Sequence, residues 1–123
     1  MSKRDSPVPR PLKRTEWEIF FDTREAQKGW TDLLATARNA TTEAWNTLTC
    51  DPLTETARLY QLKADFAYLT RNGRTYARYQ YKVTDGGRIW FYVDPAPKGT
   101  RAKTAGRVFL ERCETAHPKE TES

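Results

Sequence analysis

Residues 76–93 read YARYQYKVTDGGRIWFYV, and this stretch decides the fold. Apolar and polar side chains alternate on both sides of the Asp85-Gly86-Gly87 turn signal, which is the pattern of strands with one buried face. We expect two antiparallel strands here, one from Thr75 to Val83 and one from Arg88 to Val93. The side chains that alternate toward the core are Ala77, Tyr79, Tyr81, Val83, Ile89, Phe91 and Val93. The opposite face then carries Tyr76, Arg78, Gln80, Lys82, Arg88, Trp90 and Tyr92.

Strand and turn signals continue on both sides of this stretch. A strand-like segment from Phe66 to Thr70 precedes it, and Arg71-Asn72-Gly73-Arg74 predicts a hairpin turn because Asn and Gly tolerate positive φ. On the other side, a loop of residues 94–106 (DPAPKGTRAKTAG) leads to a last strand from Val108 to Cys113. This part of the chain is therefore expected to supply a run of antiparallel strands.

Nearer the N-terminus, a short strand is followed by segments in which the apolar period is close to four. The strand runs from Glu16 to Phe21, with alternate side chains on one face. Asp22 and Glu25 resemble a capping box that opens a first helix. Asn39 can cap a second helix, which should end before Asp51-Pro52 because a residue preceding proline disfavours the helical conformation. The apolar positions are Ala26, Trp30, Leu33, Leu34 and Ala37 in the first helix and Ala40, Ala44, Trp45 and Leu48 in the second.

The order of strand, two helices and then strands predicts an α+β fold, an antiparallel sheet with an N-terminal helical hairpin packed on one face. A chain of 123 residues has room for one domain, which we expect to span residues 15–117. Residues 1–14 are rich in Pro, Lys and Arg and predict a disordered basic arm, and residues 118–123 a flexible tail.

The net charge of +5 is unevenly distributed along the chain. Residues 58–112 contain 12 Lys and Arg against 4 Asp and Glu, a net charge of +8, whereas residues 15–57 contain 3 against 8, a net charge of −5. A basic half attracts polyanions, and nucleic acid is the commonest such partner. The alternative is that the charge serves only solubility.

Other classes of protein are disfavoured by composition. The mean hydropathy is −0.85, and no apolar run approaches the roughly 18 residues that a membrane span needs. No apolar segment follows the basic N-terminus to act as a signal sequence, so we expect a cytoplasmic protein without a membrane partner. Cys50 and Cys113 belong to no metal-binding spacing, and we expect two buried free thiols and no metal site.

Aromatic side chains are interleaved with the basic ones and favour the nucleic-acid interpretation, because exposed bases stack on aromatic rings. Trp90 and Tyr92 are the main candidates on the outward face. The alternative is that these two side chains only cover the sheet. The aromatic residues of the basic half that could stack on bases are Tyr60, Tyr76, Tyr79, Tyr81, Trp90 and Tyr92.

Three motifs lie in an order found in a known family. Leu62-Lys63 precedes the hairpin, GRIWFY follows at residues 87–92, and the last strand ends in Cys113-x-x-x-His117. In these motifs and in the order of its elements, the chain from Trp17 to His117 resembles the RelE/ParE toxin superfamily of type II toxin–antitoxin modules. The resemblance implies a RelE-like fold and a toxin that cleaves mRNA, usually at the ribosome, and so inhibits translation. It also implies a small acidic antitoxin as partner.

The resemblance assigns roles to individual residues. Lys63, Arg78, Arg88 and His117 fall where the family has its phosphate-binding and acid/base groups, with Arg88, His117 and Arg78 as catalytic candidates. Two departures stand out: Tyr60 replaces a glutamate that is catalytic in some members, and Pro118 follows the histidine in place of an aromatic residue. The residues expected to bind RNA are Lys63, Tyr76, Lys82, Trp90 and Tyr92.

The chemistry of RNA cleavage also asks for these residue types. Attack by a 2′-hydroxyl needs a base, cations near the phosphate and an acid for the leaving oxygen, and it requires neither a metal nor another cofactor. Arg88 suits the developing charge because its planar fork matches two phosphate oxygens. His117 titrates near neutrality, although a lone histidine can also be a solvated surface residue. Tyr60 and Tyr76 are the candidates for its partner in proton transfer.

Two other functions stay open at this stage. A ParE-like toxin would inhibit a protein such as DNA gyrase, and a binding module would hold RNA or DNA without cutting it.

Overall fold

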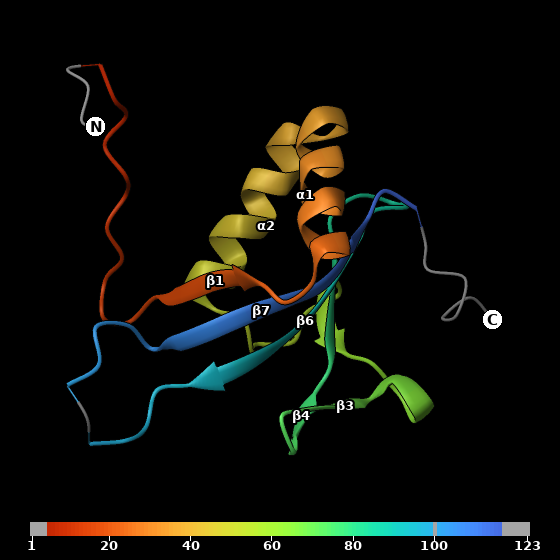
Figure 1. The fold of residues 1–123 in the computed structure, drawn as a ribbon. Coiled ribbons are helices and arrows are strands. Elements are labelled where there is room, and N and C mark those ends of the chain that lie inside the picture. The colour runs from red at the N-terminus through yellow and green to blue at the C-terminus, as the bar shows by residue number, and fades with distance from the viewer. Residues whose placement is uncertain (1–4, 100, 117–123) are drawn as a thin grey trace.

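The computed structural model describes residues 5–99 and 101–116 (Figure 1). Its first half contains β1 (Trp17–Phe21), α1 (Arg24–Thr36), α2 (Arg38–Cys50), β2 (Leu59–Gln61) and the 3-10 turn η1 (Ala64–Phe66). Its second half contains β3 (Tyr68–Arg71), β4 (Arg74–Ala77), β5 (Tyr79–Lys82), β6 (Arg88–Pro95) and β7 (Gly106–Glu114). The fold is therefore of the predicted α+β class. None of the described helices is long and apolar enough to cross a membrane.

The main sheet is mixed, which corrects the expectation of a wholly antiparallel one. Its strand order is β1-β7-β6-β5-β2. The first strand runs parallel to the last, with Trp17 opposite Gly106 and Phe21 opposite Leu110, and the other neighbouring pairs are antiparallel. Alternation identifies a strand but not its partner, and the pairing of β1 with β7 joins segments from opposite ends of the domain.

The predicted strand from Thr75 to Val83 is two strands that belong to different sheets. β4 pairs with β3 in a separate hairpin, and β5 pairs with β2 and β6 in the main sheet. Arg78 is the junction: its backbone N–H donates to the carbonyl of Ala67, and its own carbonyl accepts from Leu62. The turn itself is as predicted, because Asn72 and Gly73 both have positive φ, 53° and 77°.

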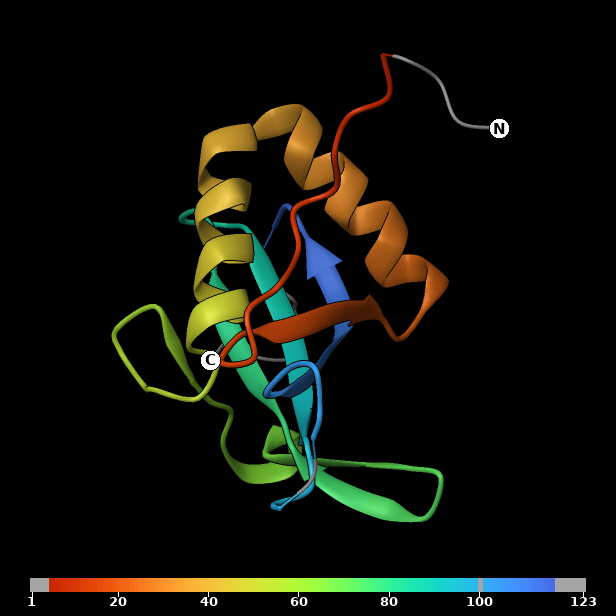
Figure 2. The same cartoon turned by 90° about the vertical axis from the view of Figure 1, so that its left-hand side faces the viewer.

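The core contains side chains from both helices and from the main sheet. Figures 1 and 2 show α1 and α2 on the opposite side of the sheet from the hairpin β3–β4. Helix α1 touches β7 directly, since a Cβ atom at Gly29 would lie 1.7 Å from the Cys113 carbonyl oxygen. The largest fully buried apolar side chains of the core are Phe91, Leu33, Leu48, Leu59, Ile89, Leu110 and Val108.

Both helix caps differ from the prediction. The N-cap of α1 is Thr23, whose hydroxyl accepts from the Ala26 N–H at 3.0 Å and donates to the Glu111 carbonyl at 2.9 Å. Asp22 does not cap the helix; its carboxylate accepts hydrogen bonds from Arg71 and Tyr92, which are distant in sequence. Helix α2 begins at Arg38 without a side-chain cap, so Asn39 lies inside the helix; the helix ends at Cys50, before the proline, as predicted.

The two cysteines are both free, but only one is buried. Cys113 lies in the core, and burial raises the pKa of its thiol to about 12. Cys50, the last residue of α2, is exposed, contrary to expectation.

The chain before β1 has no regular structure from Ser6 to Lys13, but it contacts the domain. Arg10 binds Glu16 through two hydrogen bonds of 2.7 and 3.3 Å, and its guanidinium lies 5.5 Å from the centre of the Trp45 ring. The hydrogen bond from Arg10, together with one from the Lys13 backbone N–H, lowers the pKa of Glu16 to about 2. Arg10 thus joins this segment to both Glu16 and α2.

Candidate nucleic-acid interface

The face of the main sheet that is turned away from the helices has a row of four residues in register. Tyr60 of β2 lies opposite Gln80 of β5, Gln80 opposite Trp90 of β6, and Trp90 opposite Arg112 of β7. We call these four residues the outer row. The alternation of β5 and β6 predicted that Gln80 and Trp90 would share this face, but it did not indicate what each would contact.

The outer row is joined by direct contacts. The Trp90 indole N–H donates to Gln80 Oε1 at 2.8 Å, and Gln80 Nε2 donates to the Tyr60 hydroxyl oxygen, also at 2.8 Å. The Arg112 guanidinium lies 4.4 Å from the centre of the Trp90 ring. Gln80 and Trp90 are buried, with 5% and 3% exposure, whereas Tyr60 and Arg112 are partly exposed. The row therefore has a fixed centre and accessible ends.

A second set of charged residues lies beside the outer row. Lys82 is opposite Arg88, and Arg88 is opposite Glu114. The Lys82 ammonium lies 5.4 Å from the centre of the Tyr60 ring. Lys82 and Arg88 are thus on one surface with Tyr60, as the sequence predicted for the two cations.

Arg88 is on the predicted face but is far less accessible than expected. Only 4% of the residue is exposed, and its Nη1 donates to the carbonyls of Thr84 and Gly87 at 2.8 and 3.0 Å. Burial lowers the pKa of its guanidinium. Both acceptor carbonyls belong to the turn between β5 and β6, so Arg88 supports this turn.

Arg78 is held by a carboxylate that the sequence analysis did not single out. Its Nε and Nη2 donate to the two carboxylate oxygens of Glu111 at 2.8 and 2.9 Å, and its guanidinium lies 5.3 Å from the Trp90 ring centre. Glu111 sits at a β-bulge, where the β6–β7 register shifts between Trp90 and Phe91. The signal was present in β7, since buried Leu110 and Cys113 are three residues apart and strict alternation cannot bury both.

Trp90 and Tyr92 are not open stacking surfaces, which corrects that expectation. Both are buried, at 3% and 4% exposure. Phe66 covers Trp90 with ring centres 5.6 Å apart, and Tyr76 covers Tyr92 at 4.7 Å. The Tyr92 hydroxyl donates to Asp22 at 2.7 Å, and burial raises the pKa of Tyr92. The separate hairpin and η1 lie over these rings, which alternation within each strand could not indicate.

The remaining candidates are more dispersed. Lys63 is exposed just before η1, and Tyr76 is half-buried with the Arg74 guanidinium 5.4 Å from its ring centre. Tyr79 and Tyr81 face the core, as their alternation predicted. His117 lies outside the described residues.

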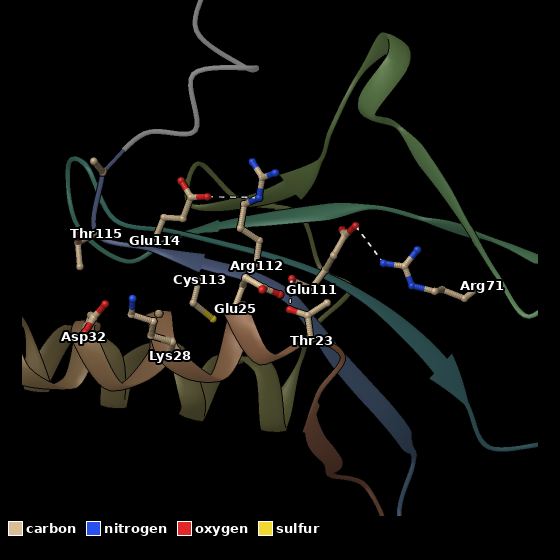
Figure 3. A pocket seen from close by; sticks show the side chains of 12 residues that line it. Thr23, Glu25, Lys28, Asp32, Arg71, Glu111, Arg112, Cys113, Glu114 and Thr115 are labelled. Atoms are coloured by element: carbon tan, nitrogen blue, oxygen red, sulfur yellow. Dashed lines mark hydrogen bonds and ion pairs between the residues drawn. The ribbon is translucent and has the colours of Figure 1, made fainter.

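An open pocket of about 620 Å³ lies between α1 and the end of β7 and shares Arg112 with the outer row (Figure 3). Its lining mixes both signs of charge. Figure 3 shows Arg71 directed at Glu111 and Arg112 directed at Glu114, ion pairs of 3.5 and 3.3 Å. The acidic lining residues Glu25, Asp32, Glu111 and Glu114 make this pocket a poor site for a polyanion, in contrast to the face that carries Lys82.

Comparison with solved structures identifies the fold as one found in bacterial toxins. The chain is similar to a YoeB/ParE toxin from Agrobacterium tumefaciens, with a TM-score of 0.55 and 12% sequence identity over 82% of this chain and 99% of that one. It is also similar to the YoeB dimer from Staphylococcus aureus, with a TM-score of 0.52 and 13% identity over 82% of this chain and 98% of that one. No protein-family model and no curated protein matches the sequence. The structural likeness confirms the RelE/ParE-like fold that the sequence resemblance implied.

Proposed function

We propose that this protein is the toxin of a type II toxin–antitoxin module and that it cleaves mRNA at the ribosome without a metal ion. The observation that carries the proposal is the outer row, in which Gln80 holds the Tyr60 hydroxyl on the same face as Lys82 and Arg88, in a fold that is found in toxins. A fixed hydroxyl among cations suits a phosphodiester, because the cations attract the phosphate and the hydroxyl adds a directional contact.

The proposed reaction is transesterification within the RNA. A base removes the proton of a 2′-hydroxyl, the 2′-oxygen attacks the adjacent phosphorus, and the bond from phosphorus to the 5′-oxygen breaks. An acid protonates the departing 5′-oxygen, leaving a 2′,3′-cyclic phosphate and a 5′-hydroxyl. We assign the acid or base role to His117, and the stabilisation of negative charge to Arg88 and Lys82, with Lys63 on a neighbouring phosphate.

The geometry around Arg78 changes its proposed part. The Nε and Nη2 groups of Arg78 both donate to Glu111, so this edge of the guanidinium is not available to a phosphate. Arg78 therefore acts first as a support for the Trp90 ring. Arg112, whose guanidinium lies 4.4 Å from the centre of the same ring, pairs with Glu114 at 3.3 Å through Nε. Its side chain is 30% exposed against 14% for that of Arg78, which makes Arg112 the better candidate for an additional phosphate.

The same face suits a small acidic antitoxin. A segment rich in Asp and Glu that covers Lys82 and the neighbouring Tyr60 end of the outer row would compete with RNA for the same cations. Co-expression with the acidic product of a neighbouring gene should therefore silence the toxin.

One observation favours a second function, that of a binding module which holds nucleic acid without cutting it. Arg88 and Arg78, two of the three residues predicted to be catalytic, are engaged in supporting contacts. A module of this kind would bind RNA through the remaining exposed cations.

Incubation of the full-length purified protein with RNA, in the presence and absence of EDTA, tests both functions. Cleavage that persists in EDTA and leaves 5′-hydroxyl ends is the expected result, with growth arrest on expression without an antitoxin. His117→Ala should lose cleavage and keep its melting temperature. Binding without cleavage would favour the binding module. The absence of both RNA binding and growth arrest would refute the proposed toxin function.

A further inference from the structure

We infer that the contacts from Trp90 through Gln80 to Tyr60 turn the hydroxyl proton of Tyr60 outward, so that Tyr60 donates a hydrogen bond to a phosphate oxygen of bound RNA. The inference rests on the proposed function in one respect, which is that RNA binds this face. It assigns a substrate contact to Tyr60 and a positioning role to Gln80.

The direction of each hydrogen bond follows from the chemistry of the groups. An indole N–H can only donate, so the oxygen of the Gln80 amide must face Trp90. The amide nitrogen then faces Tyr60, and since it too can only donate, the Tyr60 oxygen must be the acceptor. The hydroxyl proton of Tyr60 therefore cannot point at Gln80 and has to find its acceptor elsewhere.

The relay is held rigidly at its Trp90 end. The Trp90 ring is contacted by Phe66, with ring centres 5.6 Å apart, and by the guanidinium groups of Arg78 and Arg112 at 5.3 and 4.4 Å. Gln80 is 5% exposed, which leaves its amide little room to rotate. A side chain fixed in this way places the Tyr60 oxygen without a further entropy cost when a ligand binds.

The surroundings of Tyr60 select an anion as the outside acceptor. The Lys82 ammonium lies 5.4 Å from the Tyr60 ring centre, and Arg88 is paired with Lys82 across β5 and β6 on the same face of the sheet. Tyr60 itself is partly exposed, so a ligand can reach it. A phosphate drawn in by these cations would accept the outward proton of Tyr60 in a charge-assisted hydrogen bond.

Gln80→Glu tests the direction of the relay with almost no change in shape. Both oxygens of a carboxylate accept, so Glu at position 80 would accept from Trp90 and also from the Tyr60 O–H, which turns the proton inward. Tyr60→Phe removes the proton altogether. Each variant should bind RNA roughly 10-fold or more weakly, as expected for the loss of a hydrogen bond to a charged group.

Affinity is measured by fluorescence anisotropy with 2′-O-methyl RNA, which cannot be cleaved by 2′-oxygen attack. Tyr68→Phe, on an exposed tyrosine of β3, is the matched control and should bind like the parent. The double variant Tyr60→Phe/Gln80→Glu separates proton direction from charge repulsion. If Gln80→Glu acts through the Tyr60 proton, it should cost little once the hydroxyl is gone.

The outcomes separate this inference from the proposed function. Parental affinity of Tyr60→Phe, or an equal cost of Gln80→Glu in both backgrounds, would overturn the inference while RNA cleavage by the parent stands. Failure of the parent to bind RNA would overturn both. Thermal melting of every variant shows whether it folds. If Gln80→Glu does not fold, the RNA affinity of Tyr60→Phe alone decides whether the inference holds.

Discussion

Arg78 and Glu111 form a bidentate ion pair, with Nε to Oε1 at 2.8 Å and Nη2 to Oε2 at 2.9 Å. The pair joins the junction between β4 and β5 to the bulge of β7, and the side chains of both residues are only 14% exposed. A positive charge that looked available for phosphate from the sequence is thus neutralised within the fold. The ion pair mainly fixes the hairpin β3–β4 in position beside Trp90.

Arg78→Ala should therefore destabilise the protein. Loss of one partner leaves the Glu111 carboxylate without its main counter-charge in a mostly buried place, and we expect the free energy of unfolding to fall by about 2–4 kcal/mol. Chemical denaturation measures the change. Arg74→Ala is the control, because the Arg74 side chain is 67% exposed and its 3.7 Å ion pair with Asp94 should contribute less than about 1 kcal/mol. A stable Arg78→Ala protein that only binds RNA less well would contradict this assignment.

Arg88→Ala should lower both stability and RNA cleavage. The substitution removes a buried guanidinium that donates to the carbonyls of Thr84 and Gly87, at a cost of roughly 1–3 kcal/mol. Cleavage should fall by a factor of about 10² to 10³ under conditions in which the variant stays folded. Phe91→Ala provides the comparison for pure core loss, with an expected cost of about 3–5 kcal/mol. Unchanged melting of Arg88→Ala would mean that the turn does not need this side chain.

Gly29→Ala should destabilise the contact between α1 and β7. The added Cβ would lie 1.7 Å from the Cys113 carbonyl oxygen, so the helix must move away from the strand, and overpacking of this kind costs about 1–3 kcal/mol or more. The better helix propensity of alanine offsets only about 1 kcal/mol of this. Thr31→Ala, on the exposed face of the same helix, should melt close to the parent. A more stable Gly29→Ala protein would show that α1 does not lie against Cys113.

The segment before β1 should detach in acid. The pKa of Glu16 is lowered from 4.5 to about 2 in the folded protein, chiefly by the hydrogen bond from Arg10. Because the folded value is the lower one, the contact stabilises the folded state fully above about pH 4.5, and this contribution is lost as the pH falls to about 2. Trp45 fluorescence reports the change, since Arg10 lies over its ring.

The difference spectrum against Trp45→Phe isolates that signal from the other tryptophans. Glu16→Gln should remove the transition, because an amide does not titrate in this range. A transition that persists in Glu16→Gln would assign it to another carboxylate.

Local sequence pattern was sufficient for both helices and for the faces of β5 and β6, but not for β2 or for the break between β4 and β5. The two-residue alternation around Asp85-Gly86-Gly87 correctly predicted that Phe91 is buried and that Gln80 and Trp90 share the opposite face. Asn72-Gly73 predicted its hairpin because tolerance of positive φ is intrinsic to Asn and Gly and needs no long-range partner. The end of α2 before Pro52 follows from the same kind of local restriction.

Contacts between distant segments were decided only by the tertiary structure. The parallel pairing of β1 with β7, the ion pair of Arg78 with Glu111, and the covering of Trp90 by Phe66 each join residues that no short-range pattern relates. For the same reason Asp22 serves Arg71 and Tyr92 in place of the helix cap that its position suggested. Alternation in β5 and β6 was enough to place Gln80, Lys82, Arg88 and Trp90 on the outer face, because it is a property of each strand by itself. Packing of η1, the hairpin and the β5–β6 turn against that face determined which side chains a ligand can reach.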